Sequence, residues 1–356
     1  MIREASVTEL AHWDELVARF DGHRVTHTLP WIRSLGAAGL GRPLYLVFEK
    51  QGEIVGCLPG LVSTVGPLRL FGSPLPGWQT VSMGPAFASD RTSAADLLGA
   101  AVPFLEQRYS IHHIEVMCGG LDQAAMAQLG FRGEPVPTFR ASLFPGDEAR
   151  TLKALRESAR RNIRRGVKLG LVVRFEEDER FVDEHYDQVR EVYLRGGHAV
   201  PFTKRRVLAC FRHLQPSGHL SAVSVYLPDG LTSIATGTFL MEGGELSLWM
   251  WAHRTQYRWY RPTELMTWTV IRRALEAGCT TFDLMGRGDF KKKFGAELDE
   301  TKYRWVRSRY RWLGQLRSWA ASGYRWQQAM RGRLARLWLS RAAVMPAAQS
   351  EEPRDA

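Results

Sequence analysis

The sequence contains few cysteines and no long apolar run. Its four cysteines, Cys57, Cys118, Cys210 and Cys279, lie far apart in 356 residues and form no CxxC pair. This spacing predicts neither a disulfide framework nor a cysteine-rich zinc site, and it fits a reducing cytoplasm. No window approaches the ~18–20 apolar residues of a membrane-spanning helix, and the first residues lack the apolar segment of a signal peptide. We therefore expect a cytoplasmic protein that neither spans a membrane nor is exported by a signal peptide.

Acidic residues are absent from one long stretch near the C-terminus. Between Lys302 and Ser350 the chain has 11 Lys and Arg residues and no Asp or Glu. Because the net charge of the whole chain is +11, the remaining residues are neutral when taken together. The excess positive charge is thus confined to this segment, which predicts an anionic partner for it.

The rest of the composition is typical of a folded protein. Hydrophobic residues make up 45% and charged residues 24% of the chain, which excludes a disordered or fibrous protein. At ~100–200 residues for each domain, the length predicts two domains.

The strongest organisational signal is alternation of strand and helix patterns. Residues 44–60 alternate as two strands with a turn at Gln51-Gly52, and residues 220–252 as three strands with turns at Asp229-Gly230 and Gly243-Gly244.

A weak internal repeat supports a duplicated α/β architecture. In each half a predicted helix, over residues 92–107 and 263–277, precedes a short apolar strand. Aligning Ile114-Glu115 with Phe282-Asp283 also aligns Met117 with Met285 and Gly120 with Gly288. This order predicts two copies of one mixed α/β fold, although any α/β protein shows strand, helix and strand twice.

A change of charge marks a boundary near Arg150. From Arg150 to Arg174 there are nine basic residues and one acid, Glu157, whereas residues 176–191 carry eight acids. The basic stretch predicts a helix with an apolar face at Leu152, Leu155, Ala159, Ile163 and Val167. Two interpretations remain open: the adjacent charged segments attract each other, or one of four arginines contacts phosphate, namely Arg160, Arg161, Arg164 or Arg165.

Three motifs in order resemble a known family. The run FDLMGRGDFKKKFG (282–295) resembles a signature near the end of Fem-type acyltransferases and related acetyltransferase-like proteins of the GNAT superfamily. The basic helix (157–170) and the segment YRWYRPTELMTWTVIRRALEAG (257–278) are similar to other parts of that group. The resemblance covers residues 150–307 well, and the first half by architecture only.

This resemblance implies an α/β protein with mixed sheets and tandem GNAT-like (acyl-CoA N-acyltransferase) domains. We expect an N-terminal GNAT-like domain over 1–149, a catalytic GNAT-like domain over 150–310, a basic amphipathic helical tail over 311–341 and disorder over 342–356. The implied function is transfer of an acyl group from an activated donor, acyl-CoA foremost, to an amine acceptor. The alternatives are an aminoacyl-tRNA-dependent Fem-type transferase and a non-catalytic RNA- or lipid-binding protein on the same fold. No metal motif is present.

The signature implies two catalytic residues. Asp283, at the end of a short apolar strand, is expected to orient or deprotonate the acceptor ammonium, or else to accept hydrogen bonds from the next turn's backbone amides. Lys291 matches the signature lysine, whose ammonium polarises the acyl carbonyl or meets a donor phosphate. Because Lys292 and Lys293 adjoin it, a solvated lysine run is the alternative.

The expected donor-binding residues are Arg254, Arg258, Arg261 and Thr263. GNAT folds hold donor phosphates on the amides at a helix N-terminus, but this loop has no glycine and places Arg261-Pro262-Thr263 where small residues are typical. The arginine side chains are therefore expected to bind phosphates, with Thr263 capping the helix. Glu264 in the first turn would repel a phosphate.

An acceptor or acyl groove is assigned to Trp249, Trp251 and Arg287, with core packing as the alternative for the two tryptophans. His253 is left out because a lone histidine is more often structural. In the tail, Trp and Leu recur at helical spacing between arginines, which suits packing on the second domain, an anionic membrane surface, tRNA or an acyl carrier protein. Peripheral membrane association therefore remains an alternative to a purely cytoplasmic location.

Overall fold

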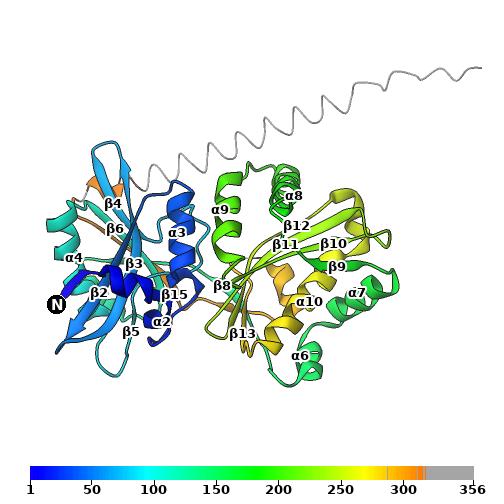
Figure 1. The fold of residues 1–356 in the computed structure, drawn as a ribbon, viewed down its shortest axis with the longest axis horizontal. Coiled ribbons are helices and arrows are strands. Elements are labelled where there is room, and N and C mark those ends of the chain that lie inside the picture. The colour runs from blue at the N-terminus through cyan, green and yellow to red at the C-terminus, as the bar shows by residue number, and fades with distance from the viewer. Residues whose placement is uncertain (287, 311, 316, 318–356) are drawn as a thin grey trace, which may run out of the picture.

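The computed structural model describes residues 1–286, 288–310, 312–315 and 317, and its strands form two mixed sheets (Figure 1). The first sheet has the order β1 (Ile2–Glu4), β2 (Arg42–Lys50), β3 (Glu53–Val65), β4 (Leu68–Ser73), β6 (His113–Gly119), β15 (Lys302–Ser308) and β7 (Arg132–Pro135), and β5 (Ala86–Phe87) pairs with β3. The second has the order β14 (Glu297–Asp299), β8 (Thr138–Ser142), β13 (Thr281–Asp283), β12 (Glu245–His253), β11 (Ser233–Glu242), β10 (Leu220–Tyr226) and β9 (Val172–Phe175).

Helices surround both sheets. The α-helices are α1 (Val7–Ala11), α2 (Trp13–Val17), α3 (Leu29–Ala37), α4 (Ala94–Tyr109), α5 (Gln123–Gln128), α6 (Glu148–Ala154), α7 (Glu157–Lys168), α8 (Phe181–Arg195), α9 (Lys204–Leu214) and α10 (Pro262–Glu276). Short 3-10 helices are η1 (Val25–His27), η2 (Thr255–Tyr260) and η3 (Asp289–Phe294). Among the described residues no helix is long and apolar enough to cross a bilayer.

The two sheets repeat one arrangement, as the sequence predicted. Each contains an antiparallel meander, β1 to β4 or β9 to β12, followed by a parallel neighbour, β6 or β13. A helix makes each parallel connection, α4 in the first sheet and α10 in the second. The hairpin turns lie where expected, with Gln51-Gly52 and Gly243-Gly244 in the left-handed region. The fold is therefore a mixed α/β duplication.

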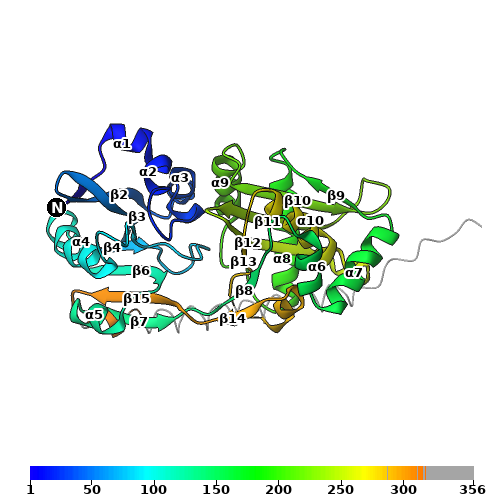
Figure 2. The same cartoon turned by 90° about the horizontal axis from the view of Figure 1, so that it is seen from below.

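The two halves exchange one strand each. β8 follows the first-half strand β7 in sequence, but it pairs with β13 and β14 of the second sheet. β15 follows β14 in sequence, but it lies between β6 and β7 of the first sheet. Figure 2 shows β15 beside β6 and β7 in the first half and β8 beside β13 in the second half. A division of the chain at residue 150 therefore does not coincide with the division into sheets.

A shared apolar core joins the halves. Helix α3 of the first half packs against α9 of the second, and Trp31 and Leu35 belong to the same buried cluster as Phe211 and Trp249. Because burial of apolar area dominates association, this interface holds the halves as one body.

The basic segment after residue 150 differs from its prediction. It forms two helices, α6 and α7, because Leu155 adopts an extended conformation between them. Leu155, Ala159 and Ile163 are buried, whereas Val167 is 65% exposed and Gly166 takes the buried position against Leu265. The tail predicted over 311–341 and the segment 342–356 lie outside the described residues, apart from 312–315 and 317.

The acidic segment also has other partners than predicted. Glu157 within α7 pairs with Arg160 and Arg164 of the same helix. The acids of residues 176–191 instead pair with cations in their own half, among them Arg180, Lys204, Arg212 and Arg254.

Candidate active site

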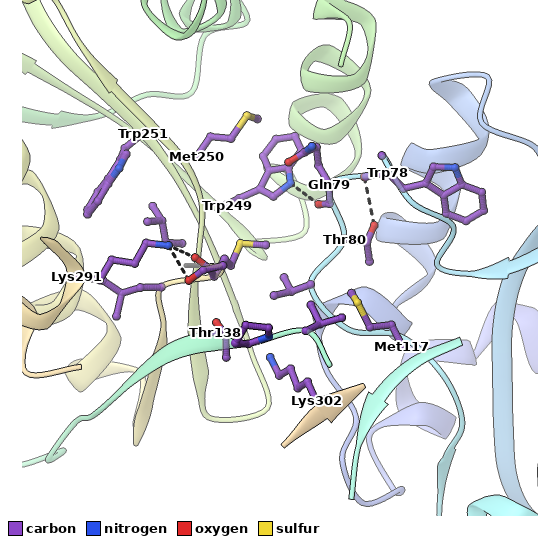
Figure 3. Close-up of a pocket in the computed structure, with 18 of the residues that line it drawn as sticks. Trp78, Gln79, Thr80, Met117, Thr138, Trp249, Met250, Trp251, Lys291 and Lys302 are labelled. Carbon is purple, nitrogen blue, oxygen red and sulfur yellow. Dashed lines mark hydrogen bonds between the residues drawn. The ribbon is translucent and has the colours of Figure 1, made fainter. Parts of the chain in front are cut away.

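A cavity of about 560 Å³ lies between the two halves (Figure 3). The first half contributes residues 77–81 and 136–138, and the second half contributes residues 248–251 of β12. Residues 284–286, which follow β13, and Lys291 close another side. We call this space the interdomain cavity. Its walls are thus built from the strand ends and loops that the duplicated fold brings together.

The interdomain cavity is lined by cationic side chains. Lys291, Lys302 and Arg304 line it, and no Asp or Glu does so among the described residues. Arg304 is paired with Glu115 at 2.9 Å, and Lys302 with Asp283. Asp283 and Glu115 do not line the cavity, so its described charged lining is cationic. Such a lining suits an anionic group or a developing oxyanion.

Lys291 is positioned by the turn that follows β13. Met285 adopts φ +53°, although it is not glycine, and its carbonyl accepts a hydrogen bond from Lys291 Nζ. The Gly286 carbonyl accepts a second at 3.1 Å. The side chain is 6% exposed, and this burial lowers its pKa from 10.5 to about 8 against the opposing charge of Asp283. A left-handed non-glycine residue costs free energy, and such residues gather at functional sites.

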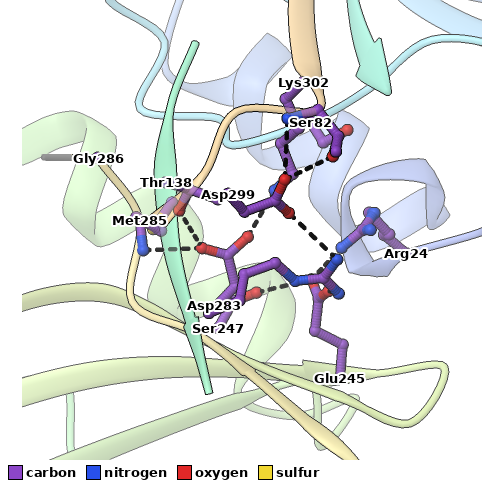
Figure 4. A network of polar contacts seen from close by, with 12 residues as sticks. Arg24, Ser82, Thr138, Glu245, Ser247, Asp283, Met285, Gly286, Asp299 and Lys302 are labelled. Atoms are coloured by element: carbon purple, nitrogen blue, oxygen red, sulfur yellow. Dashed lines mark hydrogen bonds and ion pairs between the residues drawn. The ribbon is translucent and has the colours of Figure 1, made fainter. Parts of the chain in front are cut away.

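Asp283 does not reach the cavity. It is fully buried, and its Oδ1 accepts hydrogen bonds from Thr138 Oγ1 at 2.5 Å and from the Met285 amide at 2.8 Å. Its Oδ2 accepts one from Lys302 Nζ (Figure 4). Burial alone would raise the pKa of Asp283, but the charge of Lys302 and these hydrogen bonds lower it. Our expectation that Asp283 deprotonates the acceptor therefore conflicts with its position, because no substrate atom can approach its oxygens.

Lys302 is a cavity residue that sequence reasoning missed. It is the first residue of the exchanged strand β15, and it is 4% exposed. On β8, Arg140 contacts Glu245 at 2.9 Å and Asp299 at 3.5 Å. The sequence near Lys302 contains no local sign of its partner Asp283, which lies on another strand.

A second pocket of about 470 Å³ adjoins the interdomain cavity, and we call it the α10 pocket. Thr263 and Glu264 at the start of α10 line it, and so do four cations, Arg195, Arg258, Arg261 and Lys293. Val192, Trp251 and Phe290 line both spaces. The two spaces therefore meet at an apolar junction close to Lys291.

The start of α10 is poorly suited to bind a diphosphate. Arg261 at the N-cap adopts φ +57°, and Pro262 has no amide hydrogen. Glu264, 2% exposed, lies in the first turn and bonds Lys293 and Asn162, each at 2.9 Å. A buried carboxylate at this place opposes the helix dipole's attraction for phosphate. This geometry agrees with the prediction from the sequence that the backbone of this loop does not bind donor phosphates and that Glu264 repels them.

The predicted donor residues separate in the structure. Arg258 and Arg261 are exposed at the α10 pocket. Arg254 points instead to α8, where it contacts Glu184 at 2.8 Å, Asp187 at 2.5 Å and Glu191 at 3.4 Å. Because three carboxylates neutralise it, Arg254 is not placed to bind donor phosphate. Thr263 lines the pocket but does not cap the helix, since its hydroxyl donates to Glu264 at 2.9 Å.

The predicted groove residues line the cavity where they are described. Trp249 donates from Nε1 to the Gln79 carbonyl at 2.8 Å across the interface. Trp251 packs between Phe290 and Phe294, with ring centroids 5.9 and 5.7 Å away. Arg287 lies outside the described residues. No group of three side chains that could hold a metal ion occurs among the described residues.

Comparisons with known proteins agree with this geometry. Residues 153–294 match the family model described as the acetyltransferase (GNAT) domain. No curated protein matches the sequence. The structure of FemX is similar, with TM-score 0.69 and 12% identity over 85% of this chain and 96% of that one.

Two further solved structures share the architecture. One is the C-terminal domain of a proposed lysylphosphatidylglycerol synthetase from Agrobacterium fabrum, with TM-score 0.54 and 12% identity over 89% of this chain and 96% of that one. The other is a tandem GNAT protein from the clavulanic acid biosynthesis pathway, with TM-score 0.51 and 13% identity over 87% and 98%. At such identities the likeness concerns the fold.

Proposed function

We propose that this chain forms an amide between a donor in the α10 pocket and an amine in the interdomain cavity. Its residues 153–294 match the GNAT acetyltransferase domain, and its fold resembles that of tandem GNAT proteins. One observation carries this proposal: the two spaces have mostly different lining residues, but they have Val192, Trp251 and Phe290 in common. A two-substrate transfer needs such an arrangement, because donor and acceptor must enter independently and meet at one point.

Lys291 is the residue that we assign to the reacting carbonyl. It lines the interdomain cavity beside Phe290 at the junction. Its ammonium would stabilise the oxyanion that develops when the amine nitrogen attacks. The new C–N bond replaces the bond between the acyl carbon and its carrier, and the proton of the attacking amine leaves with the carrier group or to solvent. A pKa of about 8 allows Lys291 to hold its charge at neutral pH.

Acyl-CoA is the first donor to test, held by arginine side chains rather than by the start of α10. Arg258 and Arg261 are exposed at the mouth of the α10 pocket. Their guanidinium groups can contact phosphate oxygens in pairs. This side-chain grip replaces the helix amides, which Pro262 and Glu264 make unsuitable.

A second donor, aminoacyl-tRNA, is favoured by the surface beside this mouth. Arg161, Arg165 and Lys168 of α7 are exposed there, and the guanidinium of Arg165 lies 5.1 Å from the ring of Trp259, which is 48% exposed. Basic side chains next to an exposed aromatic ring suit unpaired nucleotides. The resemblance to Fem-type transferases also implies aminoacyl-tRNA as the donor.

The function is tested with two donors and a matched pair of lysine variants. Purified protein is incubated with acetyl-CoA or with charged tRNA and a panel of amines, some carrying phosphate or carboxylate, and the amide product is measured by mass spectrometry. We expect amine-dependent transfer that is lost in Lys291→Met. Lys292→Met is the control, because Lys292 is more exposed and pairs with Asp289 at 2.9 Å. Absence of transfer from both donors in the wild type would support the non-catalytic alternative instead.

The predicted anionic partner of the C-terminal segment has a separate test. Deleting residues 318–356 should weaken retention on anionic liposomes, tRNA or acyl carrier protein, while acyl transfer to a soluble amine continues. Unchanged retention on all three would contradict the prediction.

A further inference from the structure

Arg206 is a buried cation without an acidic partner. It lies on α9 at the interface of the two halves and is 2% exposed. Its Nε donates to the Trp78 carbonyl at 3.3 Å, and its Nη1 donates to Ser34 Oγ at 3.1 Å. The guanidinium carbon lies 4.8 Å from the ring centroid of Trp31 and 5.1 Å from that of Trp249. Its Nη2 has no hydrogen-bond partner among nitrogen and oxygen atoms, and the buried Cys210 thiol on the same helix is a further neutral partner of the guanidinium.

This burial is unfavourable for folding. Removing a guanidinium from water costs more than removing an apolar side chain of similar size, and no carboxylate here offsets that cost. These neutral partners and two aromatic faces replace the water only in part. A methionine or leucine would fill the same space among Trp31 and Trp249 at lower cost, so stability alone does not account for an arginine at this position.

Two of the contacts of Arg206 belong to one wall of the interdomain cavity. Trp78 and Trp249, which it touches from opposite halves, both line the cavity. Gln79 lies between them, adopts φ +52° and accepts the Trp249 indole hydrogen bond. Arg206 thus donates to the Trp78 carbonyl, which precedes the left-handed residue Gln79. Figure 3 shows Trp78, Gln79 and Trp249 together at this part of the cavity. A loop in that conformation needs surrounding contacts to hold it.

We propose that Arg206 is a positioning residue that holds the wall formed by Trp78, Gln79 and Trp249, and thereby determines which acceptors the cavity admits. The inference rests on the proposed function for its acceptor. It assigns Arg206 no contact with substrate, because Arg206 does not line the cavity. The wall that it sets lies on the acceptor side, away from the α10 pocket, so donor binding should not depend on it.

The test compares Arg206→Met and Arg206→Lys with Arg205→Met. Arg205 is the adjacent exposed arginine, which donates to the Ala37 carbonyl at 2.9 Å. We expect Arg206→Met to unfold at the same temperature as the wild type or higher, and to raise the acceptor KM at least tenfold while the donor KM stays unchanged. Arg206→Lys should recover part of this loss, and Arg205→Met should behave as the wild type. An unchanged acceptor KM in Arg206→Met would overturn the inference, and so would equal rises in both KM values.

A readout without turnover separates this inference from the proposed function. Hydrogen exchange of the peptide covering residues 75–83 should be faster in Arg206→Met than in Arg205→Met. The reason is that the Trp78 carbonyl in this loop loses its hydrogen bond from the Arg206 guanidinium. Equal exchange in both variants would overturn the inference even if the wild type proves active. If exchange is faster in Arg206→Met but the wild-type protein transfers no acyl group, Arg206 remains a positioning residue and only the proposed function is rejected.

Discussion

Replacing Asp283 with Asn should destabilise the fold strongly. Both Thr138 and the Met285 amide donate to Oδ1 of Asp283, so an Asn at this position keeps those bonds only by placing its amide oxygen there. Its NH₂ group then faces the Lys302 ammonium, which leaves two donors opposed and a buried cation without a counter-ion. Breaking a buried ion pair by removing one partner costs ~3–5 kcal/mol, and we expect a loss of that size.

A double-mutant cycle distinguishes this ion pair from independent side chains. Lys302→Met alone leaves the Asp283 carboxylate buried without its cation, and it should cost ~3–5 kcal/mol as well. The double variant carries neither charge and should lose much less than the sum of the two single variants, with coupling of ~2 kcal/mol or more. The free energy of unfolding is measured in urea at pH 7. Additive losses within ~0.5 kcal/mol, the range found for independent sites, would refute the reasoning.

Three further predictions concern single side chains. In the wild type, kcat/KM for transfer should fall as pH rises above about 8, because the Lys291 ammonium then loses its proton; a rate that keeps rising past pH 9 for an acceptor already deprotonated would contradict its role. Burial would raise the pKa of Glu115, but hydrogen bonds from His113 and Arg317 and the charges of Arg304 and Arg317 lower it to about 2. The stability that Glu115 contributes is therefore complete above pH 4.5 and is lost as pH falls toward 2, and Glu115→Gln should flatten that part of the acid-unfolding curve. Ser93→Ala removes the capping box of α4 and should cost ~1 kcal/mol in urea unfolding, with no change in transfer.

The elements that could be predicted from the sequence are those with local causes. Gln51-Gly52 and Gly243-Gly244 determine their hairpins because each turn needs the left-handed conformation that these residues adopt. The repeated order of strand and helix patterns also follows from local sequence, and it correctly predicted the duplicated fold. The break at Leu155 was missed, since the apolar spacing of α6 and α7 continues across it.

The candidate site depends on contacts that local patterns do not contain. Lys291 was found through its signature, and Trp249 and Trp251 through strand alternation, and all three line the interdomain cavity. The catalytic expectation for Asp283 conflicts with its burial against Lys302, which arrives on an exchanged strand, whereas the alternative of a bond from the next turn's amide agrees with the Met285 contact. Arg254 was assigned to phosphate although its carboxylate partners lie on α8, more than sixty residues earlier in the chain.

The exchanged strands also determine when the protein can finish folding during its synthesis. The first sheet gains β15 between β6 and β7 only after residue 308 has left the ribosome. Until then β6 has an unpaired edge, and an unpaired edge is a template for association with other chains. Neither half can therefore be produced alone with a complete sheet, because each sheet includes a strand supplied by the other part of the chain.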